Sequence, residues 1–376
     1  MTTESKFAAS MSQIVSDNPT ADISCLQMEA VHEQVVAGFF RSFAELGLTC
    51  NAHFNRRILK QNGDLFQLLS YPGVHVDYPV MEGAHCWKAI ASRVVDEDPK
   101  FIFMNTLQRE GIAKWIEQFD RDVVGVIHNP KLFAASEACI QLAESGRLTA
   151  FCLAPYVVDK LKDAVPSLRD RAHVHYAYEV LPPGVDEYES DPGVLNILIP
   201  GAVNYSNRGF EGLIDTLRKT HSNLPRPVKF TIAAGGPDRA RLEQDIKDHD
   251  LDACFDLMPL DARSGRVPYR LYVQCLSRCH AIMPLLPQGR QDYLHQKVTS
   301  GVLAGIGAAR PMICPENVGE AYGFEPVLVP SDRPFDVSEA DLSSETLQDR
   351  RQKLLRIRER GLEHNTNTLR ETLSRR

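Results

Sequence analysis

Leu195-Asn196-Ile197-Leu198-Ile199-Pro200-Gly201 begins the stretch of this 376-residue chain that decides its fold. The apolar run stops at a glycine, and a polar loop at residues 204–209 leads into a helical pattern over 210–219. A second strand pattern, 228–234, stops at Gly235-Gly236-Pro237. Strand, glycine, basic loop and helix in this order are typical of an open α/β sheet, which presents backbone donors and cations to a phosphate at the carboxyl ends of its strands. The sequence therefore predicts a Rossmann-like sheet in the second half.

The first half repeats the alternation of short apolar segments with helical patterns. After the first segment comes a long amphipathic helix, which Gly47 is expected to end. The predicted strands are residues 23–28, 49–54, 74–80, 101–105, 123–128, 148–153 and 174–178. This spacing indicates βαβ units and a parallel sheet covered on both faces.

The length of the chain fits two domains better than one core. We expect an N-terminal Rossmann-like domain over residues 1–187 and a second one over 188–343. The acidic, turn-rich segment 187–193 is the expected linker. The remaining 344–376 read as a charged helix, which we expect to pack back on the N-terminal domain. The fold class predicted is α/β, with two Rossmann-like domains facing across a cleft.

Composition excludes several classes of protein. The net charge of −7 disfavours a nucleic-acid binder, and we find no apolar run long enough to cross a bilayer. The start of the chain lacks a secretory signal, and the 9 cysteines are odd in number and scattered, which favours reduced thiols in the cytoplasm. Cys275, Cys279 and His280 lack the second pair that a zinc site needs. Neither half carries Gly-x-Gly-x-x-Gly after its first strand, which disfavours an NAD-dependent dehydrogenase.

Four places in the second half together resemble the nucleotide-binding domain of glycosyltransferases with the GT-B architecture. Arg208-Gly209 stands where that family usually has a lysine and a glycine, and residues 231–242 resemble its glycine-proline turn and following helix. Residues 267–285 resemble the short helix and strand before its donor loop, and 305–313 a small-residue helix end followed by a strand. In the first half only the order of elements matches.

The resemblance implies a glycosyltransferase that moves a sugar from a nucleotide-diphosphate sugar to a hydroxyl acceptor. The acceptor could be a glycan, a lipid-linked sugar or a small molecule. The large retaining branch of the family carries two glutamates seven residues apart across the donor loop, and residues 286–300 contain no such pair. Ala304 falls about where the second glutamate would stand, so a retaining mechanism is in doubt.

Donor-side candidates follow from the charge that develops on a departing diphosphate, which fixed cations and helix N-termini stabilise. Arg208 lies between a strand and a helix, and Lys297, Thr299 and Ser300 stand at the predicted start of a helix over 301–308. Alternatively, the hydroxyls only cap that helix and Lys297 is solvated. Further expected contacts of the nucleotide sugar are Gly201, Asn204, Gly235, Met258 and Tyr293.

Acceptor-side candidates come from the first half. His128 ends a strand, and a histidine there has a pKa suited to deprotonating a sugar hydroxyl, so we predict a catalytic role for it with Arg208 and Lys297. It could instead bind the sugar or fix the turn. His32 and Glu33 open the first long helix, and Asn105 ends another strand. These three are predicted to lie on the acceptor side, although Glu33 could simply complement the helix dipole.

The Asp-x-Asp metal motif of the single-domain glycosyltransferases is not apparent in the sequence, so we expect a metal-independent enzyme whose only cofactor-like ligand is the nucleotide-sugar co-substrate. Two alternatives remain: a sugar-nucleotide epimerase of the same fold, and a non-catalytic GT-B-like binding protein. The basic C-terminal helix could touch an anionic membrane, but its interleaved glutamates favour a solvated packing helix. The oligomeric state, the sugar and the nucleotide stay open.

Overall fold

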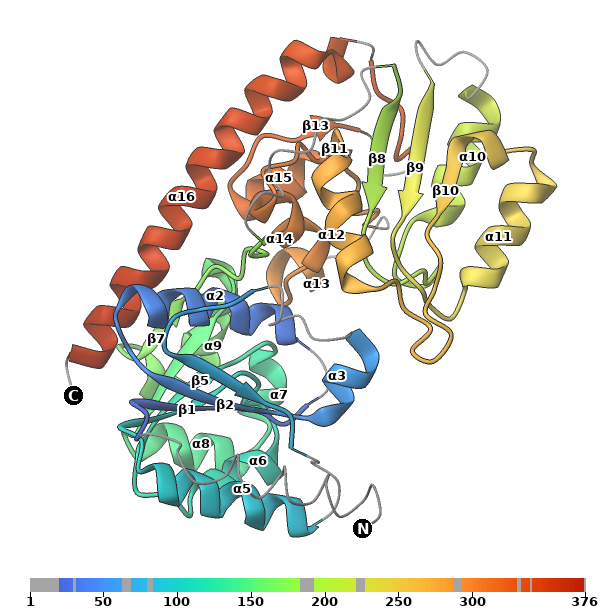
Figure 1. Ribbon diagram of the computed structural model, residues 1–376. Helices are drawn as coiled ribbons and strands as arrows, with labels where there is room; N and C mark the ends of the chain where they lie inside the picture. Colours follow the sequence, from blue (N-terminus) through green and yellow to red (C-terminus); the bar gives the residue numbers. More distant parts are fainter. Residues whose placement is uncertain are drawn as a thin grey trace, which may run out of the picture.

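The computed structural model describes residues 20–29, 32–62, 69–79, 84–182, 193–220, 227–286, 292–329, 333–338 and 340–374. Two parallel sheets organise the chain, one of seven strands and one of four. Figure 1 shows them in two units, which we call the seven-stranded unit (residues 20–182) and the four-stranded unit (residues 193–338). The predicted α/β class is confirmed.

The larger sheet has the order β3-β2-β1-β4-β5-β6-β7, and all its strand pairs are parallel. Its strands are β1 (Ile23–Gln27), β2 (Cys50–Phe54), β3 (Val74–Asp77), β4 (Phe101–Met104), β5 (Asp122–Val126), β6 (Leu148–Cys152) and β7 (Ala172–Val174). The chain runs outward from β1 to β3 and then returns to β4 on the other side of β1. A crevice opens where the strand order reverses in this way, and ligands bind in such crevices in open α/β sheets.

Successive side chains of each strand point to opposite faces of this sheet, and a separate hydrophobic core covers each face. Phe103 of β4 packs with Phe39 and Phe43 of one long helix, whereas its neighbours Ile102 and Met104 pack on the opposite face. The helices of this unit are α2 (Glu33–Glu45), α3 (Arg56–Asn62), α5 (Ala84–Glu97), α6 (Glu110–Ile116), α7 (Pro130–Ala134), α8 (Glu137–Glu144) and α9 (Pro155–Ala164). The sheet is thus covered on both faces.

The smaller sheet has the order β10-β9-β8-β11 and is also parallel. Its strands are β8 (Leu195–Ile199), β9 (Val228–Ile232), β10 (Phe255–Leu257) and β11 (Ala281–Ile282), and β12 (Ile313–Cys314) pairs with β13 (Val327–Leu328) beside it. The helices of this unit are α10 (Phe210–Thr220), α11 (Arg239–Asp248), α12 (Tyr269–Arg278), α13 (Asp292–His295), α14 (Ser300–Gly307) and α15 (Glu316–Tyr322). The strand order reverses between β8 and β11, which gives this sheet its own crevice.

One predicted strand is displaced. The segment expected at 174–178 pairs only over Ala172–Val174. Beyond Val174, the side chain of Asn365 bonds to the backbone of Tyr176. Its Oδ1 accepts from the Tyr176 N–H at 2.8 Å, and its Nδ2 donates to the Tyr176 carbonyl at 2.9 Å. A side chain from the far end of the chain therefore replaces a neighbouring strand. Apart from Gly193, the expected linker 187–193 lies outside the described residues, as does Val80.

The last helix, α16 (Ser344–Ser374), runs along one side of the molecule past both units (Figure 1). Leu347 near its start belongs to the core of the four-stranded unit, whereas Leu369 belongs to a core that contains α2 and α14. Arg358 donates to the Gly307 carbonyl at 2.9 Å, and Thr366 donates to Glu45 of α2 at 2.7 Å. The helix therefore contacts both units. In the part of the chain described, no helix is both long and apolar enough for a bilayer span.

Gly361 shows how closely α16 is packed. A Cβ at this position would overlap the ring of Tyr178 in the segment that follows β7. We expect Gly361→Ala to lower the free energy of unfolding by roughly 1–3 kcal/mol through overpacking. At an exposed helix position the same change would instead stabilise by about 1 kcal/mol. Urea unfolding measures the difference, with Gln352→Ala on the exposed side of α16 as the control. A stabilised Gly361→Ala protein would contradict this packing.

Candidate functional site

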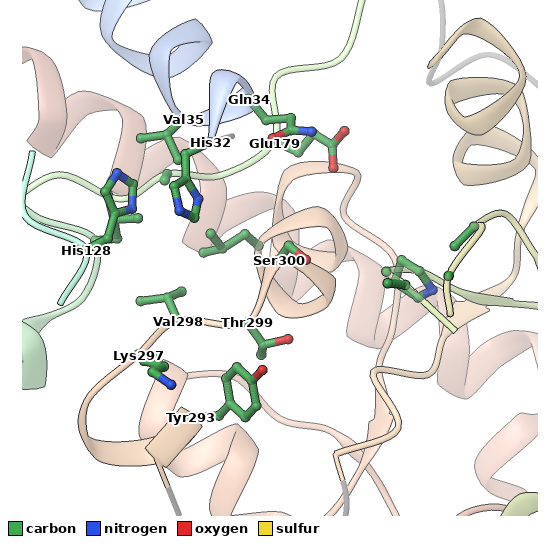
Figure 2. Close-up of a pocket in the computed structure, with 18 of the residues that line it drawn as sticks. His32, Gln34, Val35, His128, Glu179, Tyr293, Lys297, Val298, Thr299 and Ser300 are labelled. Carbon is green, nitrogen blue, oxygen red and sulfur yellow. The ribbon is translucent and has the colours of Figure 1, made fainter. Parts of the chain in front are cut away.

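A cavity of about 920 Å³ lies between the two units, and the crevices of both sheets open into it. His32 and His128, which follow β1 and β5, line it from the seven-stranded unit. Gly201 and Gly235, which follow β8 and β9, line it from the four-stranded unit. Figure 2 shows the two imidazoles on one side of this cavity, with Ser300, Thr299, Lys297 and Tyr293 further along its wall. The volume lies at the upper end of the range for small-molecule sites, roughly 300–1,000 Å³.

Arg208 is the central cation of the four-stranded wall. Its guanidinium lies over Gly201, whose φ is 88° and where a Cβ would overlap the Arg208 side chain. The Nη1 group donates to the Pro284 carbonyl just beyond β11, so the side chain bridges the crevice between β8 and β11. Burial lowers the pKa of Arg208, and no carboxylate of the described residues pairs with it. A largely buried charge without a counter-ion is costly, and an anionic ligand would supply one.

The loop before α14 brings three predicted residues to the same wall. Lys297, Thr299 and Ser300 line the cavity, and Lys297 Nζ lies 3.3 Å from Asp292 Oδ2. Thr299 is the N-cap residue of α14, but its hydroxyl makes no capping bond. Lys297 is therefore neither simply solvated nor unpaired, and the side chain of Thr299 does not cap the helix.

Two tyrosines from distant parts of the chain hold this loop. The Tyr156 hydroxyl of α9 donates to the Lys297 carbonyl at 2.8 Å, across the boundary between the units. The Tyr322 hydroxyl of α15 donates to the Tyr293 carbonyl at 3.0 Å and accepts from the Thr299 N–H at 2.9 Å. Tyr293 itself lines the cavity, as predicted from the sequence. The tyrosines fix the backbone that carries the basic and hydroxyl side chains.

Of the remaining donor-side candidates, Gly235 lines the cavity, whereas Asn204 and Met258 do not. Gly235 lines the cavity, and a Cβ there would overlap the Gly265 carbonyl, so close packing of two loops requires a glycine. Asn204 does not line the cavity, because its Oδ1 accepts from the N–H and hydroxyl of Ser206 within the loop. Met258 also lies outside the lining and packs against the hydrophobic core. The described lining therefore does not include these two predicted contacts.

His32, Asn105 and His128 meet where the order of the larger sheet reverses. The two imidazole rings stack with their centroids 4.1 Å apart and an angle of 16° between them. Asn105 is buried and connects the pair, since its Nδ2 donates to the His32 carbonyl and its own carbonyl lies 2.8 Å from His128 Nε2. A carbonyl only accepts, so Nε2 of His128 carries the hydrogen. His32 is exposed to the cavity and holds a φ of 70°, a conformation uncommon outside glycine.

Burial keeps both imidazoles uncharged near neutral pH. It lowers the pKa of His128 to about 3, to which the neighbouring His32 contributes, and it also lowers the pKa of His32. Glu33, the other acceptor-side prediction, is buried beneath the cavity rather than on its described lining. Burial raises the pKa of the Glu33 carboxyl, and the charge of Arg266 opposes that rise.

Glu179 is a functional candidate that the sequence did not indicate. It is the single carboxylate on the described part of the lining, which also includes the cations Arg208, Arg266 and Lys297. The signal that could have found it is its place five residues after the last strand of the larger sheet, directly after the predicted strand 174–178. The described residues hold no cluster of three histidine, cysteine or acidic side chains that could bind a metal ion.

Comparisons with known proteins identify the architecture. Neither a protein-family model nor a curated protein matches the sequence. Among solved structures, HepE of Anabaena in complex with UDP and glucose is 12% identical, with a TM-score of 0.60 over 94% of this chain and 99% of that one. A variant of Os79 from O. sativa in complex with UDP is 10% identical, with a TM-score of 0.56 and the same two coverages.

A putative UDP-N-acetylglucosamine 2-epimerase from Listeria monocytogenes is similar as well. It is 11% identical, with a TM-score of 0.53 over 88% of this chain and 90% of that one. At such identities the likeness establishes the fold, which is the predicted GT-B arrangement of two Rossmann-like domains across a cleft.

Arg208 gives the most direct test of the four-stranded wall. We expect Arg208→Gln to weaken the binding of inorganic pyrophosphate by roughly 10- to 100-fold, the range of one or two hydrogen bonds to a charged group. Isothermal titration calorimetry measures this. Arg241→Gln is the matched control, because Arg241 is exposed on α11, pairs with Glu211 and lies outside the lining. Equal pyrophosphate affinities for Arg208→Gln and the control would remove Arg208 from the site.

Proposed function

We propose that this chain, which has the GT-B fold, transfers a sugar from a nucleotide-diphosphate sugar to a hydroxyl acceptor. The observation that carries the proposal is a cavity with two unlike walls. One wall carries a guanidinium that has no carboxylate partner among the described residues, and the other carries a pair of neutral imidazoles. The guanidinium suits a leaving diphosphate and the imidazoles suit an attacking hydroxyl. The direct test is the release of nucleoside diphosphate from UDP-glucose on addition of hydroxyl acceptors.

The donor would bind with its diphosphate at Arg208 and at the start of α14. Arg208 supplies fixed positive charge, Ser300 a hydroxyl, and Lys297 a second cation after a small shift from Asp292. These groups are held in place before the bond breaks, and preorganised charge of this kind stabilises a developing anion most effectively. UDP is the first nucleotide to try, because structures of HepE and Os79 with the same fold contain it.

The acceptor hydroxyl would lose its proton to His32. The sequence placed this role on His128, but the Nε2 of His128 is engaged with Asn105 and its pKa of about 3 makes it a weak base. His32 is exposed to the cavity, and none of the described side chains hydrogen-bonds to its ring. We therefore infer that His128 supports the His32 ring by stacking and that His32 accepts the proton.

The described lining from the seven-stranded unit up to Ala177 is free of formal charge and includes several aliphatic side chains. The aliphatic members are Val35, Ile127, Leu132, Leu153 and Val157. Such a wall suits an uncharged acceptor whose hydroxyl stands on an apolar skeleton. An acceptor panel is best begun with neutral hydroxylated aromatic compounds.

The two histidines differ in their expected effect on turnover. We expect His32→Gln to reduce kcat roughly 10²- to 10⁴-fold, the usual contribution of a general base, with UDP affinity unchanged. His128→Gln should cost less. Because burial lowers the pKa of His32, the acid limb of wild-type kcat/KM should fall below pH 6.5. A larger loss in His128→Gln than in His32→Gln would reverse the two roles.

An epimerase is the second candidate, since the Listeria protein shares the fold. Incubation of the wild-type chain with labelled UDP-N-acetylglucosamine in the absence of acceptor separates the two functions. A transferase returns the sugar nucleotide unchanged, whereas an epimerase converts it to its isomer. UDP binding without either reaction across a broad acceptor panel would favour the binding protein.

We also propose that the reaction needs no divalent metal, because Arg208, Lys297 and the start of α14 provide the positive charge at the leaving group. Transferase activity should be the same in excess EDTA as in magnesium or manganese. The measurement is the initial rate of UDP release under the three conditions. Strict dependence of that rate on added metal would contradict the proposal.

A further inference from the structure

We propose that the Glu179 carboxylate binds hydroxyl groups of the donor sugar and selects neutral sugars over uronic acids. The inference rests on the function proposed above and adds a residue that recognises the transferred group. It is carried by the position of Glu179, by its hydrogen bonds and by the electrostatic cost of keeping it in the cavity.

The backbone of Glu179 is held at the meeting point of the two units. Its N–H donates to the Leu303 carbonyl of α14 at 3.3 Å. A Cβ at Gly307 would overlap the backbone of Glu179, so the segment that follows β7 lies directly against α14. Glu179 thus has a fixed position next to the helix whose start lines the cavity.

The side chain of Glu179 accepts two hydrogen bonds and retains the capacity for more. The Tyr272 hydroxyl donates to its Oε2 at 3.0 Å and the Tyr269 hydroxyl to its Oε1 at 3.4 Å. An ionised carboxylate offers about four acceptor positions, so about two remain for a ligand. Vicinal sugar hydroxyls are donors that match such a pair of oxygens. In Figure 2, Glu179 stands next to Gln34, at the end of the cavity away from Tyr293 and Lys297.

Tyr272 connects this carboxylate to the proposed diphosphate site. Besides its bond to Glu179, Tyr272 interacts electrostatically with Arg208, and all three side chains line the cavity. The sugar of a nucleotide-diphosphate sugar is joined directly to its second phosphate. A donor whose diphosphate contacts Arg208 therefore brings its sugar into the neighbourhood of Glu179.

Ionisation of Glu179 lowers the stability of the folded protein. Burial raises the pKa of Glu179 to about 7, and Glu33 of α2 raises it further, while the hydroxyls of Tyr269 and Tyr272 on α12 only partly offset the effect. The charge of Arg266 lowers the pKa of Glu33. A glutamine could accept one tyrosine bond with its oxygen and donate to the other hydroxyl with its nitrogen, without this cost, which points to use of the charge itself.

The same charge explains selectivity. The hydroxyls of a neutral hexose donate to the carboxylate, whereas the carboxylate of a uronic acid would be repelled by it at short range. No other described residue of the lining is acidic, so discrimination by charge would depend on Glu179 alone.

Glu179→Gln tests the proposal through the affinities of UDP, UDP-glucose and UDP-glucuronic acid, measured by calorimetry at pH 8, above the Glu179 pKa of about 7. We expect UDP affinity to stay unchanged, UDP-glucose to bind about tenfold more weakly, and the preference for UDP-glucose over UDP-glucuronic acid to shrink by at least as much. Glu320→Gln is the matched control, since Glu320 is exposed on α15 and outside the cavity.

Equal affinity changes for UDP and UDP-glucose, or no change in either, would overturn the role of Glu179 while leaving the proposed function in place. A wild-type chain that binds neither UDP nor UDP-glucose would overturn both.

Thermal unfolding provides the second measurement. Because the folded pKa of Glu179 lies above the ordinary value of 4.5, its ionisation lowers stability progressively between about pH 4.5 and pH 7. Glu179→Gln removes this loss, so its unfolding temperature should exceed that of the wild type at pH 8 by more than at pH 4.5. A variant less stable than the wild type at both pH values would make Glu179 a structural anchor and contradict the proposal.

Discussion

The guanidinium of Arg208 over Gly201 is the contact on which the cavity depends. A positive φ and the absence of a Cβ at Gly201 make the room, and the Pro284 carbonyl fixes the orientation of the side chain. The protein therefore holds a largely buried positive charge without a carboxylate partner among the described residues. Such a charge is tolerated where an anionic ligand supplies the opposite charge. Arg208 lies at the strand-order reversal of the smaller sheet, which is where open α/β sheets bind their ligands.

The two crevices face each other because the units share one hydrophobic core. Residues of β1, β4 and α2 pack in the same cluster as Val302 and Ile306 of α14 and Leu369 of α16. Tyr156 adds a polar connection from α9 to the loop that carries Lys297. The imidazole pair and the cationic wall are thus positioned by packing before any substrate arrives, which suits preorganised electrostatic stabilisation.

Local patterns predicted most of the fold, because apolar runs and their spacing determine parallel strands and covering helices. Arg208, His32 and His128 could be identified since each lies between a strand and the helix that follows it. Glu179 could not, because it reaches the cavity only through packing between distant segments. The bond from Tyr156 to the Lys297 carbonyl could not be identified for the same reason. The same limit explains the displaced end of the larger sheet, where Asn365 of α16 replaces a strand partner. Asn204 and Met258 follow strands as well, yet a local turn and the core hold their side chains away from the cavity lining.

A crystal structure of this protein with bound UDP tests the central claim most directly. The account predicts that the pyrophosphate lies between Gly201 and the start of α14, with Arg208 in contact with its oxygens and the imidazole of His32 across the cavity. Pyrophosphate density elsewhere on the molecule, or a guanidinium that turns away from the bound nucleotide, would contradict it.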